Sequence, residues 1–192
     1  MIRLRKRPAL WLATSLASLL MARPLPAAPI AGVTFPETVE AGGRQLKLNG
    51  TALLKRLVLR VYAVALYLPA PAHETETVVE PDVPKVLILQ FLRAVSREQL
   101  VSPLEQDFAR NAGEKGRRAR GQIAKMLLAI KDMEKGDRMT FTYEPGKGST
   151  IRMSDGTTTS FEGKDFADSF LLVYVGPNPP KEEMKRRLLG RI

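Results

Sequence analysis

The stretch Arg56-Leu-Val-Leu-Arg-Val-Tyr-Ala-Val-Ala-Leu-Tyr-Leu-Pro69 decides the fold. Side chains alternate between the two faces of a strand. Both alternating sets here are mostly apolar, which predicts a central strand over Leu57–Leu68 that is covered on both sides. On such a strand Arg60 and Tyr62 share one face, and a buried guanidinium is costly unless it is paired or reaches water. Arg60 therefore either meets a carboxylate of the fold or forms, with Tyr62, the polar end of a ligand pocket.

The segments before and after this run also read as strands. Arg44–Asn49 alternates polar and apolar residues and is expected to end in a turn at Asn49-Gly50. A loop rich in proline and acidic residues spans 69–84, and Lys85–Leu92 is a second strand with a buried composition.

The pattern then changes to helical periodicity. Two capping boxes follow each other, and Pro103 stands at the first helical position of the second one, which predicts a helix over Pro103–Arg110. Gly113–Gly116 should break it. A second helix is expected because apolar residues recur on one stripe, namely Ala119, Ile123, Met126, Leu127 and Ile130.

The last third returns to strands and then to helices. A three-stranded antiparallel meander is predicted over Asp137–Glu144, Ser149–Met153 and Thr157–Phe161. An apolar helix over Asp165–Val175 and a short basic helix ending at Leu189 follow. This order predicts an α+β fold, an antiparallel-rich sheet with helices packed on one face and a ligand cleft between the two layers.

The N-terminus has the composition of a secretory signal peptide. A basic segment precedes an apolar run and a stretch of small residues and prolines, so residues 1–28 are expected to be removed, with cleavage within Ala27–Ala31. The domain is then 32–190 and the protein periplasmic or secreted; a retained signal anchor is the alternative. The chain lacks Cys, which excludes disulfides and thiolate chemistry.

Charge and histidine content narrow the partners and cofactors. The formal charge of the 192 residues is +10, and five basic residues of 1–28 leave +5 for the rest, which is no signature of nucleic-acid binding. With a single His, neither a metal site nor any other cofactor is expected. A basic cluster over Arg110–Lys125 indicates a solvated helix face, a peripheral contact with an anionic membrane surface, or a contact with an acidic partner.

An ordered set of short motifs resembles the chalcone isomerase-like family, and in particular its bacterial exported branch, whose plant relatives include fatty-acid-binding proteins of the same fold. No single motif is specific, but the set spans roughly residues 32–190. The motifs are Leu48-Asn49-Gly50, Arg60–Leu68, Phe91–Ser96, Lys135–Arg138, Asp165–Ala167, Gly176–Pro179 and Leu188–Gly190.

The resemblance implies a site for a small ligand. In the family an Arg and several hydroxyl or amide groups bind a phenolate or, in non-catalytic members, a fatty-acid carboxylate. The family's Arg position falls on Leu54 here, beside Lys55 and Arg56, and its strand Thr falls on Tyr62. The family's helix Tyr and Asn fall near Gln99 and Gln106, and its C-terminal Thr falls near Val173.

Together these observations predict a domain that binds a small apolar ligand, such as a fatty acid, and is not a catalyst. Its expected ligand-binding residues are Arg60, Tyr62, Leu54, Gln99, Gln106 and Val173. Two alternatives remain: an intramolecular lyase or isomerase acting on a phenolic or enone substrate, and an interaction protein whose cleft is filled by its own side chains.

Overall fold

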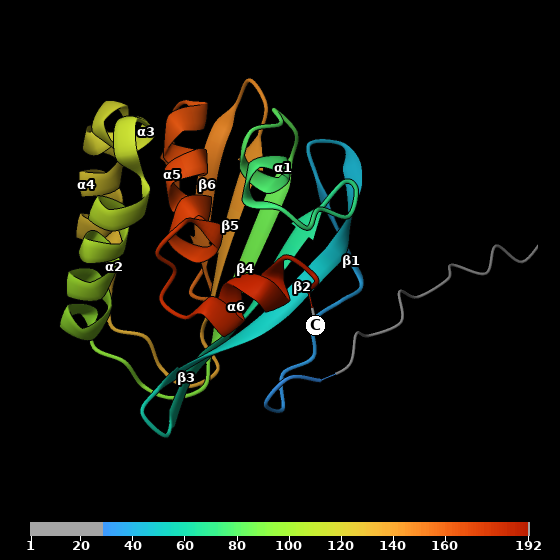
Figure 1. Ribbon diagram of the computed structural model, residues 1–192. Coiled ribbons are helices and arrows are strands. Elements are labelled where there is room, and N and C mark those ends of the chain that lie inside the picture. The colour runs from blue at the N-terminus through green and yellow to red at the C-terminus, as the bar shows by residue number, and fades with distance from the viewer. Residues whose placement is uncertain (1–28, 192) are drawn as a thin grey trace, which may run out of the picture.

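Seven strands form one antiparallel sheet in which every strand pairs with its neighbours in chain order. The computed structural model describes residues 29–191 (Figure 1). The strands are β1 (Thr38–Ala41), β2 (Arg44–Arg56), β3 (Leu59–Leu68), β4 (Lys85–Phe91), β5 (Arg138–Glu144), β6 (Gly148–Met153) and β7 (Thr158–Phe161).

Residues 29–191 form six helices beside the sheet, and the larger ones lie over a single face of it (Figure 1). They are α1 (Thr75–Val79), α2 (Arg97–Asn111), α3 (Gly113–Arg118), α4 (Arg120–Ala129), α5 (Lys164–Val175) and α6 (Glu182–Leu188). The predicted α+β class, with helices on one face of an antiparallel sheet, is confirmed.

The main core lies between the sheet and these helices. It centres on α5, whose Phe166 and Phe170 are fully buried and stack on Phe161 of β7 and Phe141 of β5 respectively. Nine of the twelve residues of α5 are buried. This agrees with its sequence, in which apolar residues occupy most of the helix surface.

A second apolar cluster covers the opposite face of β3 and β4. There the segment before β1 lies against the sheet and contributes Val33 and Phe35, and the Tyr67 hydroxyl donates a hydrogen bond to the carbonyl of Pro36 at 2.9 Å. Residues 61–68 of β3 are accordingly all buried, as expected for a strand covered on both sides. The core residues lie between Val33 and Leu189, so a chain that begins at residue 29 contains both clusters.

Some predicted boundaries were wrong. Asn49-Gly50 is not a turn: β2 continues to Arg56, and the register shift between Leu48 and Gly50 marks a bulge inside the strand. The hairpin turn is instead Leu57-Val58, at the start of the run that was assigned entirely to one strand.

The helical boundaries also differ. α2 begins at Arg97, because Ser96 and Gln99 form the capping box. Pro103 lies inside the helix, where it removes one backbone donor and its ring crowds the carbonyl four residues earlier. α2 ends at Asn111, just before the break expected at Gly113–Gly116, but Gly113–Gly116 itself belongs to the separate short helix α3. The loop 69–84 contains α1, and the lead-in segment contains β1, neither of which the sequence pattern had indicated.

Candidate functional site

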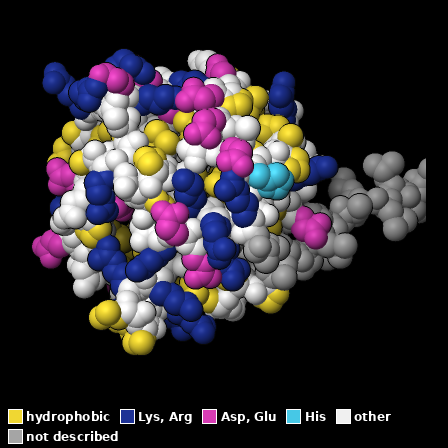
Figure 2. All heavy atoms as spheres, viewed as in Figure 1, with side chains coloured by type: hydrophobic (Ala, Val, Ile, Leu, Met, Phe, Trp, Pro, Cys, Tyr) yellow, Lys and Arg dark blue, Asp and Glu magenta, His cyan; other side chains and the backbone are white. Residues whose placement is uncertain are grey.

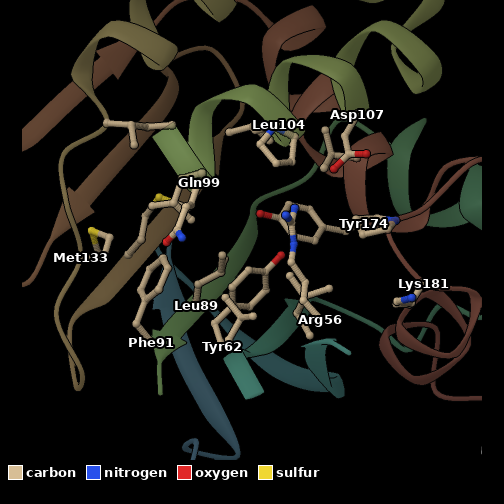
Figure 3. A pocket seen from close by; sticks show the side chains of 18 of the residues that line it. Arg56, Tyr62, Leu89, Phe91, Gln99, Leu104, Asp107, Met133, Tyr174 and Lys181 are labelled. Atoms are coloured by element: carbon tan, nitrogen blue, oxygen red, sulfur yellow. The ribbon is translucent and has the colours of Figure 1, made fainter. Parts of the chain in front are cut away.

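A cavity of about 470 Å³ lies between the helix-facing side of the sheet and α2 (Figure 3). Its floor comes from β2, β3 and β4, its roof from α2, and its ends from α5, the segment before α6, and the segment after α4. Cavities of roughly 300–1,000 Å³ are typical of sites for small organic ligands. The described part of the chain therefore has an open cleft where the order of elements predicted one.

A β-bulge in β3 determines which side chains enter the cavity. Leu54 of β2 pairs with Tyr62, but the next residue, Lys55, pairs with Arg60, so Val61 is the extra residue of the bulge. The alternation of faces is broken at this point. Val61 and Tyr62 both line the cavity, whereas Arg60 is exposed and does not.

This bulge corrects the expectation that Arg60 and Tyr62 share a face. Arg60 lies two residues from the exposed turn Leu57-Val58, so its charge reaches water and pays no burial penalty. Neither of the two roles considered for Arg60 from the sequence applies in this geometry, since it neither lines the cavity nor forms an ion pair among the described residues.

The polar end of the cavity is formed by Arg56, Tyr62 and Tyr174. Arg56 is the last residue of β2, and Tyr174 lies in the last turn of α5. Figure 3 shows the Arg56 side chain reaching toward the two phenol rings. A guanidinium and two phenols therefore converge on one part of the cavity, close enough for Tyr174 and Arg56 to affect the pKa of Tyr62.

Burial keeps both phenols protonated. Desolvation is the main cause that raises the pKa of Tyr62, and the carboxylate of Asp107 adds to it, while Tyr174 and the Arg56 guanidinium act in the opposite direction. Burial likewise raises the pKa of Tyr174 well above its ordinary value. Both hydroxyls are therefore hydrogen-bond donors at neutral pH rather than bases.

The rim of the polar end carries more positive than negative charge. Lys55, Arg56, Arg110 and Lys181 line it, against a single carboxylate, Asp107. Asp107 is buried and forms an ion pair with Arg110 one turn further along α2. This balance favours an anionic or partly negative group at this end.

The other end of the cavity is apolar and rich in methionine. Met133, Met139 and Met153 lie there together with Leu89, Phe91 and Ile130. Unbranched methionine side chains adapt to irregular apolar shapes. One cavity thus joins a polar end with donors and cations to an adaptable apolar end.

Five of the six residues proposed from the sequence line this cavity: Tyr62, Leu54, Gln99, Gln106 and Val173. Their proximity to one another is a geometric finding, and their role in binding stays a prediction. Arg60 is the one that the structure places elsewhere.

Sequence reasoning missed Arg56, Asp107 and Tyr174. In the sequence, Arg56 was considered only as a neighbour of Leu54, the position where the family's Arg falls. A shift of two preserves the face of a regular strand, so Arg56 and Leu54 belong to the same side, and both line the cavity. Tyr174 adjoins Val173, but only the helix packing shows that both reach the cavity.

Residues 29–191 contain neither a membrane-spanning helix nor a cluster of metal-ligating side chains. None of their helices is long and apolar enough to cross a membrane. No group of three His, Asp or Glu side chains in this part of the chain is arranged to hold a metal ion.

Comparison with known proteins adds a family and a fold. A family model described as chalcone isomerase-like matches residues 27–190. No curated protein matches the chain. Among solved structures, a fatty-acid-binding protein of Arabidopsis thaliana superposes with a TM-score of 0.67 at 16% sequence identity, covering 86% of this chain and 96% of that one. Identity this low establishes a shared fold and nothing finer.

Proposed function

This chain belongs to the chalcone isomerase-like family, and from that premise we propose that it binds a medium- or long-chain carboxylate in the cavity between sheet and α2. The single observation that supports this most is the division of the cavity into a cationic, donor-rich end and a methionine-rich apolar end. The plant protein of the same fold is described as a fatty-acid-binding protein.

The carboxylate lies at Arg56. A guanidinium and a carboxylate form a charge-assisted pair, which is stronger than a hydrogen bond between neutral groups. Tyr62 and Tyr174 remain protonated, so their hydroxyls can donate to the second carboxylate oxygen. Asp107 does not repel the ligand strongly, because Arg110 already compensates its charge.

The alkyl chain lies along Leu89 and Phe91 toward Met133, Met139 and Met153. Burying each methylene group stabilises the complex by about 0.8 kcal/mol. Affinity should therefore rise with chain length until the apolar end is full, and then level off.

The test compares Arg56→Met with Arg60→Met. Both side chains belong to exposed residues of the same hairpin, but only Arg56 lines the cavity. Loss of a hydrogen bond to a charged group costs about 1.5–3 kcal/mol, so Arg56→Met should weaken binding roughly ten- to hundredfold in calorimetric titration with a saturated fatty acid. Arg60→Met should bind like the unchanged protein.

The comparison also has an outcome against the proposal. If the two variants bound the fatty acid with equal affinity, Arg56 would not belong to the site. If the unchanged protein bound no fatty acid of any chain length, the proposal would be wrong. Thermal unfolding of both variants checks that the fold is intact.

A catalytic function is the second candidate, and the convergence of Arg56, Tyr62 and Tyr174 favours it. Neutral phenols beside a guanidinium can polarise a ketone oxygen during an intramolecular addition. Against it, the resemblance assigns the family's Arg to Leu54 and its Thr to a position near Val173, and both of these residues are apolar. The same preparation can be assayed for chalcone ring closure. A rate no higher than that of the uncatalysed reaction would exclude this catalytic function and leave binding as the function.

A further inference from the structure

The tip of the β2–β3 hairpin is the most exposed apolar feature of the described residues. Leu57 is 98% exposed, Val58 is 89% exposed and Leu59 is half exposed. The hairpin projects beyond the sheet at the bottom of Figure 1, and apolar side chains protrude at the same place in Figure 2. Side chains this exposed contribute almost nothing to the core.

The backbone of the turn makes these residues more unusual. Leu57 has a φ of 54°, in the left-handed region that glycine normally occupies in a two-residue hairpin turn. A leucine held there is strained. Glycine would relieve the strain and remove an exposed apolar side chain at once, so the folding of the hairpin does not account for Leu57.

The base of the tip is positively charged. Lys55 and Arg60 lie opposite each other in register, Arg56 follows Lys55, and no Asp or Glu occurs between Glu40 and Glu74. Among the described residues, no carboxylate forms an ion pair with any of these three cations.

The basic helix surface over Arg110–Lys125 differs in this respect. Lys115 contacts Asp168 and Glu80, Arg118 contacts Asp165, and Arg117 contacts Glu114. Most of that positive charge is already compensated within the fold. The unpaired cations at the tip are therefore better placed to attract an external anionic surface.

The tip adjoins the mouth of the cavity. Lys55, Arg56 and Val61, which flank the tip on both strands, also line the cavity. A surface that receives the tip would therefore lie against the opening of the cavity.

We propose that Leu57-Val58-Leu59 inserts into the outer layer of an anionic lipid bilayer, while Lys55 and Arg60 contact the lipid phosphates. A convex tip of three aliphatic residues is far too small for a stable protein interface, which buries about 1,200–2,000 Å². A bilayer needs no matching shape, and apolar insertion combined with attraction of basic residues to anionic lipids is how peripheral proteins bind it. This docking is independent of which ligand occupies the cavity.

The test uses residues 29–192, because the apolar segment 1–28 could itself bind lipid and this part contains both core clusters. Vesicle flotation compares Leu57→Ser/Val58→Ser with Leu128→Ser, a 77% exposed leucine of α4. The tip variant should lose at least about tenfold in partition to vesicles containing phosphatidylglycerol, because it loses two inserted apolar groups. Leu128→Ser should bind like the unchanged protein. Added salt should weaken the binding of Leu128→Ser and of the unchanged protein alike.

A second measurement reports insertion directly. The only Trp of the chain is Trp11, so Val58→Trp in residues 29–192 gives a single fluorophore at the tip. Its emission should shift to shorter wavelength on anionic vesicles and be quenched by lipids brominated in their acyl chains.

Several outcomes would overturn the proposal. They are no binding to anionic vesicles, equal binding by the tip variant and Leu128→Ser, and an unshifted Trp emission. If the tip variant instead changes only the oligomeric state in solution, the tip is a protein contact and the membrane proposal is wrong.

Discussion

At the scale of single residues, Lys85 is the most unexpected group of the molecule. Its side chain is completely buried, donates hydrogen bonds to the carbonyls of Pro81 at 2.5 Å and Val79 at 3.4 Å, and lies over the ring of Tyr143. Burial, reinforced by Lys164, lowers the pKa of Lys85 to about 8. The sequence places Lys85 at the start of a strand, but only the folded loop before it supplies the carbonyls that cover it.

Lys85 should make stability depend on pH in the alkaline range. Its pKa is 10.5 in the unfolded chain and about 8 in the folded one, so between these values the unfolded state binds more protons. The free energy of unfolding should therefore rise with pH above about 8, by at most about 1.4 kcal/mol per pH unit. Lys85→Met should lack this rise, as measured by urea unfolding from pH 7 to 9.5.

Buried tyrosines set the upper limit of the pH range in which stability rises. Burial raises the pKa of Tyr62 and Tyr67 above 10, so near pH 10 these residues ionise first in the unfolded chain and stability then falls. If the free energy of unfolding of the unchanged protein and of Lys85→Met changed with pH in parallel, Lys85 would not be the group responsible for the rise above pH 8.

At the scale of elements, α6 is attached to β2 at Asn49-Gly50. The Asn49 amide donates to the carbonyls of Ala72 and Leu188 at 2.9 and 2.7 Å and accepts from the backbone N–H of Ala72 at 2.8 Å. A Cβ on Gly50 would lie 2.0 Å from the carbonyl oxygen of Arg187. The dipeptide that resembles a turn is the place where the end of α6 meets the sheet.

Gly50→Ala should therefore displace α6. Overpacking of this kind costs about 1–3 kcal/mol and can cost more where only backbone can move. Gly121→Ala is the matched control: Gly121 lies in α4 with open space around its Cα, so alanine should stabilise that helix by up to about 1 kcal/mol. Gly50→Ala should lower the denaturation midpoint and Gly121→Ala should raise it. An unchanged midpoint for Gly50→Ala would contradict the close contact between Gly50 and the end of α6.

The elements differ in how well their sequences predict them. The meander β5–β7 and helix α5 follow from local signals, because the period of apolar residues and the turn at Asp155-Gly156 are determined within a few residues. The bulges at Asn49 and Val61 depend on the partner strand, and no local pattern marks them. This is why the face of Tyr62 was predicted and that of Arg60 was not.

The capping boxes show the same limit. Ser96 and Ser102 carry equivalent local signals, and only the upstream one caps α2. The choice depends on how the start of the helix docks: the backbone N–H of Arg97 bonds the Asp132 carboxylate at 2.6 Å, a contact between residues 35 positions apart. Long-range contacts of this kind lie beyond a reading of sequence periods.

At the scale of the whole molecule, the cavity and the hairpin tip lie next to each other, so the proposed ligand site and the proposed lipid contact are neighbours. The cavity was predictable from the order of strands and helices, because a sheet covered on one face by helices has its natural cleft between the layers. Its polar end was predictable only in part, since Arg56, Tyr62 and Tyr174 come from three elements whose relative positions depend on the bulge in β3 and the packing of α5.

Export remains a proposal about the whole chain, because residues 1–28 lie outside the described residues. The cleavage point is expected within Ala27–Ala31. Ile30 exchanges backbone hydrogen bonds with Val33 at 2.9 Å and packs against the second apolar cluster, so a cut before Ile30 leaves the fold complete. N-terminal sequencing of protein from fractionated cells should find the first residue between Ala28 and Ile30, outside the cytoplasm.

A charge in the apolar segment tests the same proposal by its mechanism. An arginine within such an apolar segment opposes membrane insertion, at a cost of about 2.5–3.5 kcal/mol where it lies at the centre. Leu19→Arg should therefore leave the uncleaved chain in the cytoplasm, whereas Leu19→Ile should be exported and cleaved normally. Uncleaved Met1 in the cytoplasm for the unchanged protein, or normal export of Leu19→Arg, would contradict the signal. Whatever the outcome, protein prepared from residue 29 should unfold at the same temperature as the full-length chain, because both core clusters lie within residues 29–191.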